Sequence, residues 1–294
     1  MENLKESLSQ KSLVGTPLIL TKHNKGFWQV SFNNTPLNLF SPEILNGLEL
    51  VAAAMQSDPE LKVIVFDSAI ENYFIAHFDI FRGAEILNKK TSSGLAPWFD
   101  VVKALFESPV VSIAKIRGRT RGVGIEFAAA CDMRFASKEK AVFGQFEVGV
   151  STIPGGGSME FLPLLVGRSR ALEIIIGADD FNADVAERYG LVNRALPDAE
   201  LDDFVYKLAM RISQFDREIT GQAKTMINAR GSMPAMAHMD ESRAAFIAAN
   251  LRPERKPVSK KVLDWGIQQN GDFELNLGSY LARIGEDKET NTNN

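Results

Sequence analysis

The chain has 294 residues, of which 45% are hydrophobic and 24% charged, and its formal net charge is −4. This composition describes an ordinary globular protein, and it lacks the basic surplus typical of nucleic-acid binding, so we expect no nucleic-acid partner. The single cysteine, Cys131, excludes an intrachain disulfide, and its place at the end of an apolar stretch predicts a small core residue rather than a reactive thiol.

The two ends of the chain are polar and show no periodic apolar pattern, so residues 1–14 and 285–294 are predicted to be mobile. The start has no apolar core of signal-peptide type, and no later apolar run reaches membrane-spanning length. We therefore expect a cytoplasmic protein without a membrane partner. The histidines are far apart in the sequence and belong to no Cys/His cluster, so no metal site is predicted for His23, His77 or His238.

The first predicted elements alternate between strands and helices. Two strands flank Asn24-Lys25-Gly26, as in a hairpin. A helix follows, with Ser41 as its cap and Asp58-Pro59 at its end. The run LKVIVFDS (residues 61–68) has the composition of a buried strand. This strand–helix–strand order indicates a crossover unit, and a similar unit recurs around PVVSIAKI (residues 109–116), which predicts an α/β fold.

The stretch from residue 109 to residue 157 combines a buried strand with two glutamates. After the strand and the turn-like segment RGRTRG, Gly122-Val123-Gly124 leads into IEFAAAC, a short helix that is apolar on every side. An ionised Glu126 in such a helix must be paired, protonated or facing a cavity. Val123 lies one turn earlier on the same face, where the first N–H groups of a helix have no intrahelical partner. Glu147, in a loop after the short strand AVFG, can enter the same space, so the three groups can supply base, acid and oxyanion stabilisation.

Three strings of this sequence resemble the enoyl-CoA hydratase/isomerase (crotonase) superfamily. They are YFIAHFDI, SIAKIRGRTRGVGIEFAAACDMRFAS and FGQFEVGVSTIPGGG, in the family's order, within a resemblance that runs from about Pro17 to Asp198. The resemblance implies that the amides of Phe78 and Val123 hold a thioester oxygen, and that Glu126 and Glu147 are the hydratase glutamates. It also implies that the neighbouring residues contact the substrate, namely Ala76, Asp79, Ile80, Phe81 and Gly124.

The resemblance further implies a crotonase-like α/β fold of repeated β-β-α units, with a core over residues 15–200. Residues 201–284 would form a helical region for oligomerisation and pocket covering, as a homotrimer or a dimer of trimers. The substrate would be an acyl-CoA thioester, and no separate cofactor is expected because coenzyme A is part of the substrate.

Several residues depart from the family pattern. Arg119 and Arg121 form part of a basic cluster with Arg117 in a turn where family members often have small or aromatic residues. They either pair with carboxylates of the protein or bind a substrate carboxylate or the phosphates of CoA, since guanidinium suits all of these. His77 stands where the family usually has glycine, and a surface or pocket-edge position is favoured over catalysis. Val123 in place of glycine, and Phe146 in place of proline, would narrow the pocket.

The segment PGGGSMEF lacks the residues of a phosphate loop and is expected to form a tight turn into a helix whose N-terminus faces the site. Four amphipathic segments follow from about residue 201. Three methionines at helical spacing could line an acyl pocket, but core or subunit contacts are favoured for Met233, Met236 and Met239.

The sequence therefore favours an enzyme that adds water to a 2,3-enoyl-CoA. Double-bond isomerisation and other enolate chemistry, such as C–C cleavage, need only the amide donors and one base, so they stay open. A non-catalytic ring-forming scaffold is the alternative from another class, although two buried carboxylates would be an avoidable cost without a role.

Overall fold

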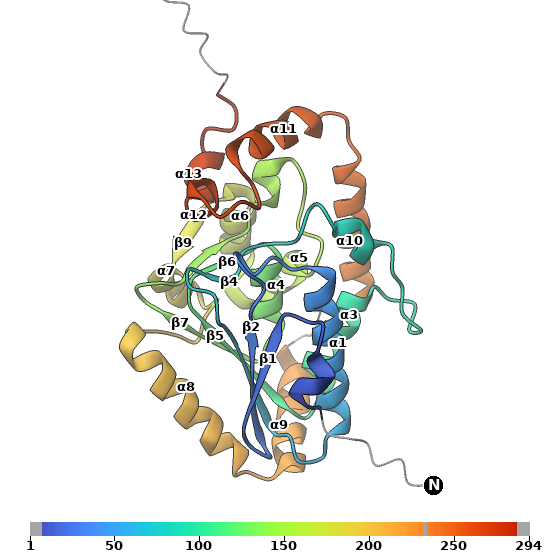
Figure 1. Cartoon of the computed structure of the whole chain (residues 1–294), viewed down its shortest axis with the longest axis vertical. Helices are drawn as coiled ribbons and strands as arrows, with labels where there is room; N and C mark the ends of the chain where they lie inside the picture. Colours follow the sequence, from blue (N-terminus) through green and yellow to red (C-terminus); the bar gives the residue numbers. More distant parts are fainter. Residues whose placement is uncertain (1–7, 232–233, 287–294) are drawn as a thin grey trace, which may run out of the picture.

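A computed structural model of the chain describes residues 8–231 and 234–286, in which two β-sheets are surrounded by helices (Figure 1). The larger sheet has six strands in the order β1-β2-β3-β5-β7-β10. Its first two strands are antiparallel, and every later pair is parallel. The strands of this sheet are Leu18–Asn24 (β1), Phe27–Phe32 (β2), Val63–Ser68 (β3), Val111–Ile116 (β5), Met133–Ser137 (β7) and Arg194–Leu196 (β10).

The smaller sheet has four strands in the order β4-β6-β8-β9, of which only the β8–β9 pair is antiparallel. Its strands are Tyr73–Ile75 (β4), Arg119–Arg121 (β6), Val142–Gly144 (β8) and Asp180–Asn182 (β9). Three successive segments of the chain each give one strand to the large sheet, the next to the small sheet, and then a helix. The structure thus contains the predicted repeat of β-β-α units, and RGRTRG, predicted to be a turn, includes strand β6.

The helices before the C-terminal region are short except for α1 and α3. They are Pro42–Ser57 (α1), Gly83–Leu87 (α2), Pro97–Glu107 (α3), Val123–Ala130 (α4), Ser158–Val166 (α5), Arg168–Gly177 (α6) and Ala183–Tyr189 (α7), with 3-10 helices at Gln10–Leu13 (η1) and Glu147–Val150 (η2). The predicted hairpin and the predicted first helix are confirmed, because β1 and β2 flank Lys25 and the Ser41 side chain caps α1.

The central strands are buried on both faces, as their continuous apolar runs predicted. In β3, Val63 and Val65 belong to the core beneath α8 (Asp198–Ser213), whereas Ile64 and Phe66 belong to the larger core shared with α1 and α3. In Figure 1, α8 lies on the opposite side of the large sheet from α1 and α3. The alternation of strand side chains therefore places two different helical layers on one sheet.

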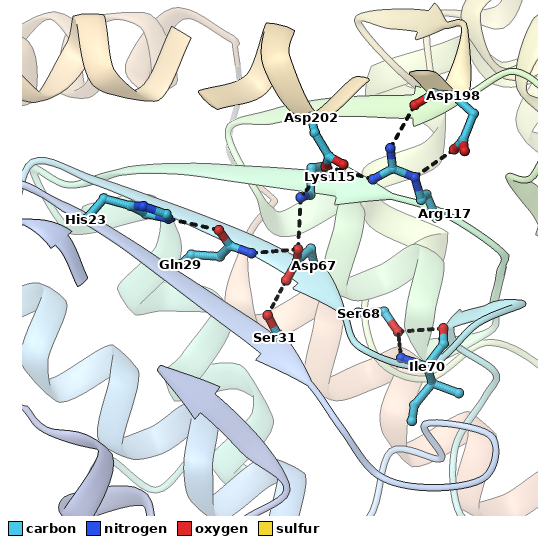
Figure 2. A network of polar contacts seen from close by, with 10 residues as sticks. All are labelled: His23, Gln29, Ser31, Asp67, Ser68, Ile70, Lys115, Arg117, Asp198 and Asp202. Atoms are coloured by element: carbon cyan, nitrogen blue, oxygen red, sulfur yellow. Dashed lines mark hydrogen bonds and ion pairs between the residues drawn. The ribbon is translucent and has the colours of Figure 1, made fainter. Parts of the chain in front are cut away.

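A polar network joins α8 to the large sheet (Figure 2). The Nζ atom of Lys115, on β5, lies 3.0 Å from a carboxylate oxygen of Asp67 on β3 and 2.6 Å from a carboxylate oxygen of Asp202 on α8. Arg117 pairs with Asp198 at 2.6 Å and with Asp202 at 2.8 Å. Arg117, the first of the three clustered arginines, is therefore paired with acids of its own chain and anchors a helix.

The C-terminal region consists of helices, as predicted: α8, Arg217–Gly231 (α9), Met236–Asn250 (α10), Arg255–Trp265 (α11), Asp272–Leu275 (α12) and Leu277–Leu281 (α13). Met239 is completely buried in the core, and Met236 packs partly against it, which confirms the core assignment for both. Met233 lies outside the described residues. Within residues 8–231 and 234–286, no helix combines the length and apolar content needed to cross a bilayer.

The predicted mobile N-terminal segment is corrected for residues 8–14. Ser9 caps helix η1 with its side chain, and Leu13 is completely buried against the larger core. Residues 1–7 and 287–294 lie outside the described part of the chain. Cys131 is buried and free, and burial raises the pKa of its thiol, so it is the predicted core residue.

Candidate active site

Glu126 lies in a helix whose eight residues are all buried. Helix α4 begins after Gly122, which adopts φ 51° and ψ −119°, a conformation that favours glycine. One carboxylate oxygen of Glu126 accepts hydrogen bonds from the amides of Gly156 at 2.8 Å and Ser158 at 3.3 Å. The predicted approach of the PGGG turn and the start of α5 to the site is therefore confirmed. These amides stabilise the ionised form of a carboxylate that burial disfavours.

The carboxylate of Glu147 is held at the start of η2, directly after Phe146. Its Oε2 accepts a hydrogen bond from the side-chain amide of Gln145 at 2.9 Å. A Cβ atom added to Gly122 would lie 2.5 Å from its Oε1, so the carboxylate rests against the backbone at the start of α4. Any larger residue at position 122 would meet the carboxylate.

A chain of hydrogen bonds connects the two glutamates. Ser158 donates its backbone N–H to Glu126 and its hydroxyl to the side-chain oxygen of Gln145 at 2.8 Å, and Gln145 in turn donates to Glu147. Ser158 and Gln145 are both completely buried. The positions of the carboxylates are therefore set by a common buried network.

Burial raises the pKa of both carboxyl groups. Together with the negative charge of Glu147, it raises the pKa of Glu126 to about 8, against the opposing effect of the Gly156 and Ser158 amides. It raises the pKa of Glu147 to about 7, although Gln145 and the charge of His77 act in the other direction. Near neutral pH the pair holds about one proton between its two members. One group that accepts a proton and one that donates a proton are therefore present together.

The backbone N–H groups of Val123 and Phe78 point away from the hydrogen bonds of the helix and of the strand bridge in which these residues lie. Val123 is the first residue of α4, where a helical N–H has no intrahelical acceptor. Phe78 forms an isolated parallel bridge with Phe40, and that bridge uses the carbonyl of His77 and the N–H of Asp79. In a parallel bridge the N–H of the intervening residue, here Phe78, points away from the partner strand.

One cavity brings all four of these residues together. It has a volume of about 70 Å³ and is lined by Phe78, Val123, Glu126 and Glu147. The rest of the lining is mostly apolar and comprises Phe40, Ile86, Leu87, Ala96, Trp98, Phe99, Gly155, Gly156, Arg243 and Phe246. Amide donors, a carboxylate pair and an apolar wall thus share a space far smaller than the sites of drug-sized ligands.

The sequence profile of the enoyl-CoA hydratase/isomerase family matches residues 22–256. The chain belongs to this family. It is accordingly an enzyme of the hydratase/isomerase type.

The chain is 34% identical over 200 residues to a crotonyl-CoA hydratase of Syntrophomonas wolfei, covering 66% of this chain and 75% of that protein. It is 29% identical to the mitochondrial methylglutaconyl-CoA hydratase of Mus musculus, covering 66% of this chain but only 62% of that protein.

Solved structures have the same fold. A crystal structure of a Streptomyces avermitilis protein, described as a candidate enoyl-CoA hydratase, superposes with a TM-score of 0.85 at 38% identity. It covers 90% of this chain, and this chain covers 96% of it. An enoyl-CoA hydratase/isomerase structure from Pseudoalteromonas atlantica has a TM-score of 0.75 at 21% identity, which shows the fold alone, and it covers 88% of this chain and is itself covered completely. The crotonase-like fold expected from the sequence is confirmed.

The residues around Phe78 and Val123 that the resemblance assigned to substrate binding lie outside the lining of this cavity. Asp79 accepts hydrogen bonds from the amides of Phe81 and Arg82 and so shapes the loop. Ala76 is completely buried, whereas Ile80 and Phe81 are 39% and 66% exposed. A Cβ on Gly124 would lie 2.6 Å from the Ile75 carbonyl, so this glycine allows α4 to approach β4.

The assignment of Arg119 and Arg121 to substrate binding is corrected, because of the two roles left open for them the structure shows contacts within the protein. Arg121 is completely buried, and its guanidinium pairs with Asp180 at 2.6 Å and donates to the carbonyl of Glu274. Arg119 donates to the carbonyl of Leu275 at 2.8 Å. Both guanidinium groups thus connect β6 to the C-terminal region, because the strand directs them there and not into the cavity.

His77 is also corrected, since it is buried and not at the surface. One ring nitrogen lies 2.9 Å from the carbonyl of Phe78, and the other lies 2.9 Å from a carboxylate oxygen of Glu274. Both neighbours are acceptors, which favours a ring with two N–H donors. Although burial opposes the charge, the carboxylate of Glu274 raises the pKa of His77. At this position, where the resemblance led us to expect glycine, the chain has a buried histidine–carboxylate pair next to Phe78.

Sequence reasoning missed four contributors to the site. The approach of the Gly triplet to the site was expected, but the hydrogen bond from the Gly156 amide to Glu126 was not, and a Cβ at Gly156 would lie 2.1 Å from a carboxylate oxygen. Gln145 stands two residues before Glu147, so its proximity was a usable signal. Trp98, which donates to the carbonyl of Gly156 at 2.7 Å, and Arg243 lie far from the motifs, and only the fold brings them to the cavity.

Proposed function

We propose that this protein adds water across the 2,3 double bond of an enoyl-CoA thioester. The observation that carries the proposal is the pair of buried carboxylates, with pKa values raised to about 8 and about 7, in one cavity with Phe78 and Val123. An enzyme that must both remove and deliver a proton near neutral pH needs such a pair.

The amides of Phe78 and Val123 serve as the oxyanion donors in this proposal. When water attacks C3, negative charge moves to the thioester oxygen, and two N–H groups fixed by backbone geometry stabilise it without reorganisation. Val123 is fixed by α4, and Phe78 by its bridge to Phe40. Removing one such donor costs about 10²–10³ in rate in comparable holes.

The glutamates carry the protons. The ionised member accepts a proton from water as its oxygen bonds to C3, and the protonated member delivers a proton to C2. The sum of the two transfers is one water added, and the pair again holds one proton afterwards. The buried connection through Ser158 and Gln145 keeps both carboxylates oriented toward the same space.

Isomerisation or C–C cleavage is the second candidate, because either uses the amide donors with a single base. The presence of both carboxylates in one cavity favours hydration over these reactions. A scaffold without activity is the third candidate. It is favoured by two departures from the family pattern, namely Val123 where glycine is expected and Phe146 where proline is expected, since both side chains would narrow the pocket.

The test is product analysis by mass spectrometry after incubation with a panel of enoyl- and acyl-CoA thioesters. We expect a gain of one water in a 3-hydroxyacyl product, abolished in Glu126→Gln and in Glu147→Gln. Glu173→Gln, at an exposed glutamate on α6 that accepts a hydrogen bond from Tyr189, is the control and should keep activity.

Turnover that survives in Glu126→Gln while Glu147→Gln is inactive would indicate isomerase chemistry. No product together with no binding of acyl-CoA in calorimetry would favour the scaffold.

Two further expectations belong to the same proposal. The amphipathic C-terminal helices support a homotrimer or a dimer of trimers, and light scattering that shows a monomer at micromolar concentration would contradict it. We also propose that the protein works in the cytoplasm on acyl-CoA as its small-molecule partner, without a separate cofactor.

A further inference from the structure

A single arginine lines the cavity among the described residues that form it. Arg243 lies on α10, and its side chain is only 13% exposed. The surrounding wall is apolar, and Phe246 lies one helical turn further on. A guanidinium beside apolar residues is costly to desolvate unless an anion or other acceptor compensates it.

The contacts that Arg243 makes with the described protein leave it poorly compensated. One terminal nitrogen donates to the backbone carbonyl of Leu87, and the other lies 3.7 Å from Asp240. Asp240 is 56% exposed, and 3.7 Å is too long for a good hydrogen bond. A guanidinium has five N–H donors, so these two contacts do not use its full capacity.

The cavity glutamates do not neutralise Arg243. Glu126 is held by the amides of Gly156 and Ser158, and Glu147 by Gln145. Within the described ranges, the ion pairs of Arg243 include neither of them. The guanidinium of Arg243 is therefore left for a partner other than these two glutamates.

The position of Arg243 indicates which part of a substrate it meets. Its guanidinium is anchored to Leu87, which forms the apolar wall together with Ile86 and Phe246. Arg243 lines the same cavity as Glu126 and Glu147, where the reacting carbons of an enoyl group would lie in the proposed function. The diphosphate of CoA is separated from the thioester by the whole pantetheine arm, so a group that meets Arg243 beside these carbons is the far end of the acyl chain.

We propose that Arg243 binds a carboxylate at the distal end of a short enoyl group, which makes the preferred substrate a dicarboxylic enoyl thioester. This inference rests on the proposed function and assigns its substrate class. A planar guanidinium pairs with a carboxylate through two parallel N–H···O bonds, and the pairing is strong where water is excluded. A neutral chain of the same length leaves the guanidinium uncompensated, so it binds less well.

The experiment compares kcat/KM for glutaconyl-CoA, which carries a distal carboxylate, with kcat/KM for the neutral 2-hexenoyl-CoA. The variants are Arg243→Met, Arg243→Lys and, as a matched control, Arg252→Met. Arg252 lies just beyond α10 and is 64% exposed. Corresponding pantetheine thioesters, which lack the nucleotide phosphates, form a second pair of substrates.

We expect Arg243→Met to lower kcat/KM for glutaconyl-CoA by about 10²-fold or more, because losing one partner of a buried charge pair has effects of that size. Arg243→Lys keeps the charge but loses the fork, so its loss should be intermediate. The value for 2-hexenoyl-CoA should not fall in Arg243→Met and should rise if anything, because the guanidinium that the neutral chain leaves uncompensated is gone. Arg252→Met should behave like the wild type.

Two results overturn the inference while leaving the proposed function intact. In the first, the wild-type enzyme hydrates both CoA thioesters, and Arg243→Met lowers kcat/KM equally for both or for neither. In the second, the loss of kcat/KM appears with both CoA thioesters and disappears with both pantetheine thioesters, which assigns Arg243 to a phosphate. Absence of hydration with every thioester in the wild type overturns the proposed function itself, so the two failures are distinguishable. Thermal unfolding of each variant checks that it is folded.

Discussion

Replacing Glu126 by glutamine should stabilise the protein, and the gain should grow with pH. The carboxyl group is fully buried in a helix that is apolar on all sides, and its pKa is raised from an ordinary 4.5 to about 8. Between these values the unfolded chain has lost the proton that the folded chain retains. The unfolded state therefore gains stability relative to the folded state as pH rises through this window.

The size of the effect follows from the same pKa values. Each tenfold step in proton affinity is worth about 1.4 kcal/mol, so the rise in pKa from 4.5 to about 8 corresponds to about 5 kcal/mol of unfolding free energy. Between about pH 5.5 and about pH 8.5, the advantage of Glu126→Gln over the wild type should grow by about 3 kcal/mol. Glutamine keeps the size of the side chain and one oxygen that accepts the amides of Gly156 and Ser158.

The measurement is urea unfolding of both proteins at the two pH values, at one fixed protomer concentration because assembly contributes to apparent stability. Glu71→Gln, at an exposed position, is the control and should show no growth of its effect with pH. An advantage of Glu126→Gln that is equal at both pH values, or that shrinks as pH rises, would refute the placement of a protonated carboxyl group in this helix.

Three further predictions concern activity and the buried charges. The pH dependence of kcat/KM should be bell-shaped with limbs near 7 and 8, because one glutamate must be ionised and one protonated, and a flat profile across this range would contradict the shared proton. Val123→Pro should fold, since proline is accepted at the first position of a helix, but should lose about 10²–10³ in kcat through the missing N–H, whereas Val123→Gly should stay active. Glu274→Gln should lower the free energy of unfolding by about 3–5 kcal/mol by leaving His77 without its anion, and unchanged stability in urea would show that the pair is not charged.

The sequence predicted the parts of the site that depend on local order. Glu126 follows Val123 by one helical turn, so one stretch of chain places an N–H donor and a carboxylate on the same face. The buried strand before them is recognisable from its β-branched run. Glu147 was placed by the resemblance and by the short strand before it. These features could be predicted because each depends on neighbours within a few residues.

What the sequence did not predict depends on partners far along the chain. Arg121 finds Asp180 and the backbone of Glu274, 59 and 153 residues away, and His77 finds the Glu274 side chain 197 residues away. A basic or titratable residue near a motif has the same local pattern whether it binds substrate or a distant acid. Only the packing of the C-terminal region onto the small sheet decides between these roles.

That packing also connects the segments of the candidate site to the C-terminal helices. Phe146, which precedes Glu147, and Val150, the last residue of the same 3-10 helix, share a buried cluster with Phe273 of α12 and Leu277 of α13. The buried polar groups also need this packing, because the ring of His77, beside Phe78, pairs with the carboxylate of Glu274 from the same region. Moving α12 away would expose an apolar surface and leave the His77 ring next to Phe78 without its carboxylate partner. The backbone at Phe78 and the position of Glu147 are therefore both supported by the same short C-terminal helices, although neither Glu126 nor Glu147 lies in them.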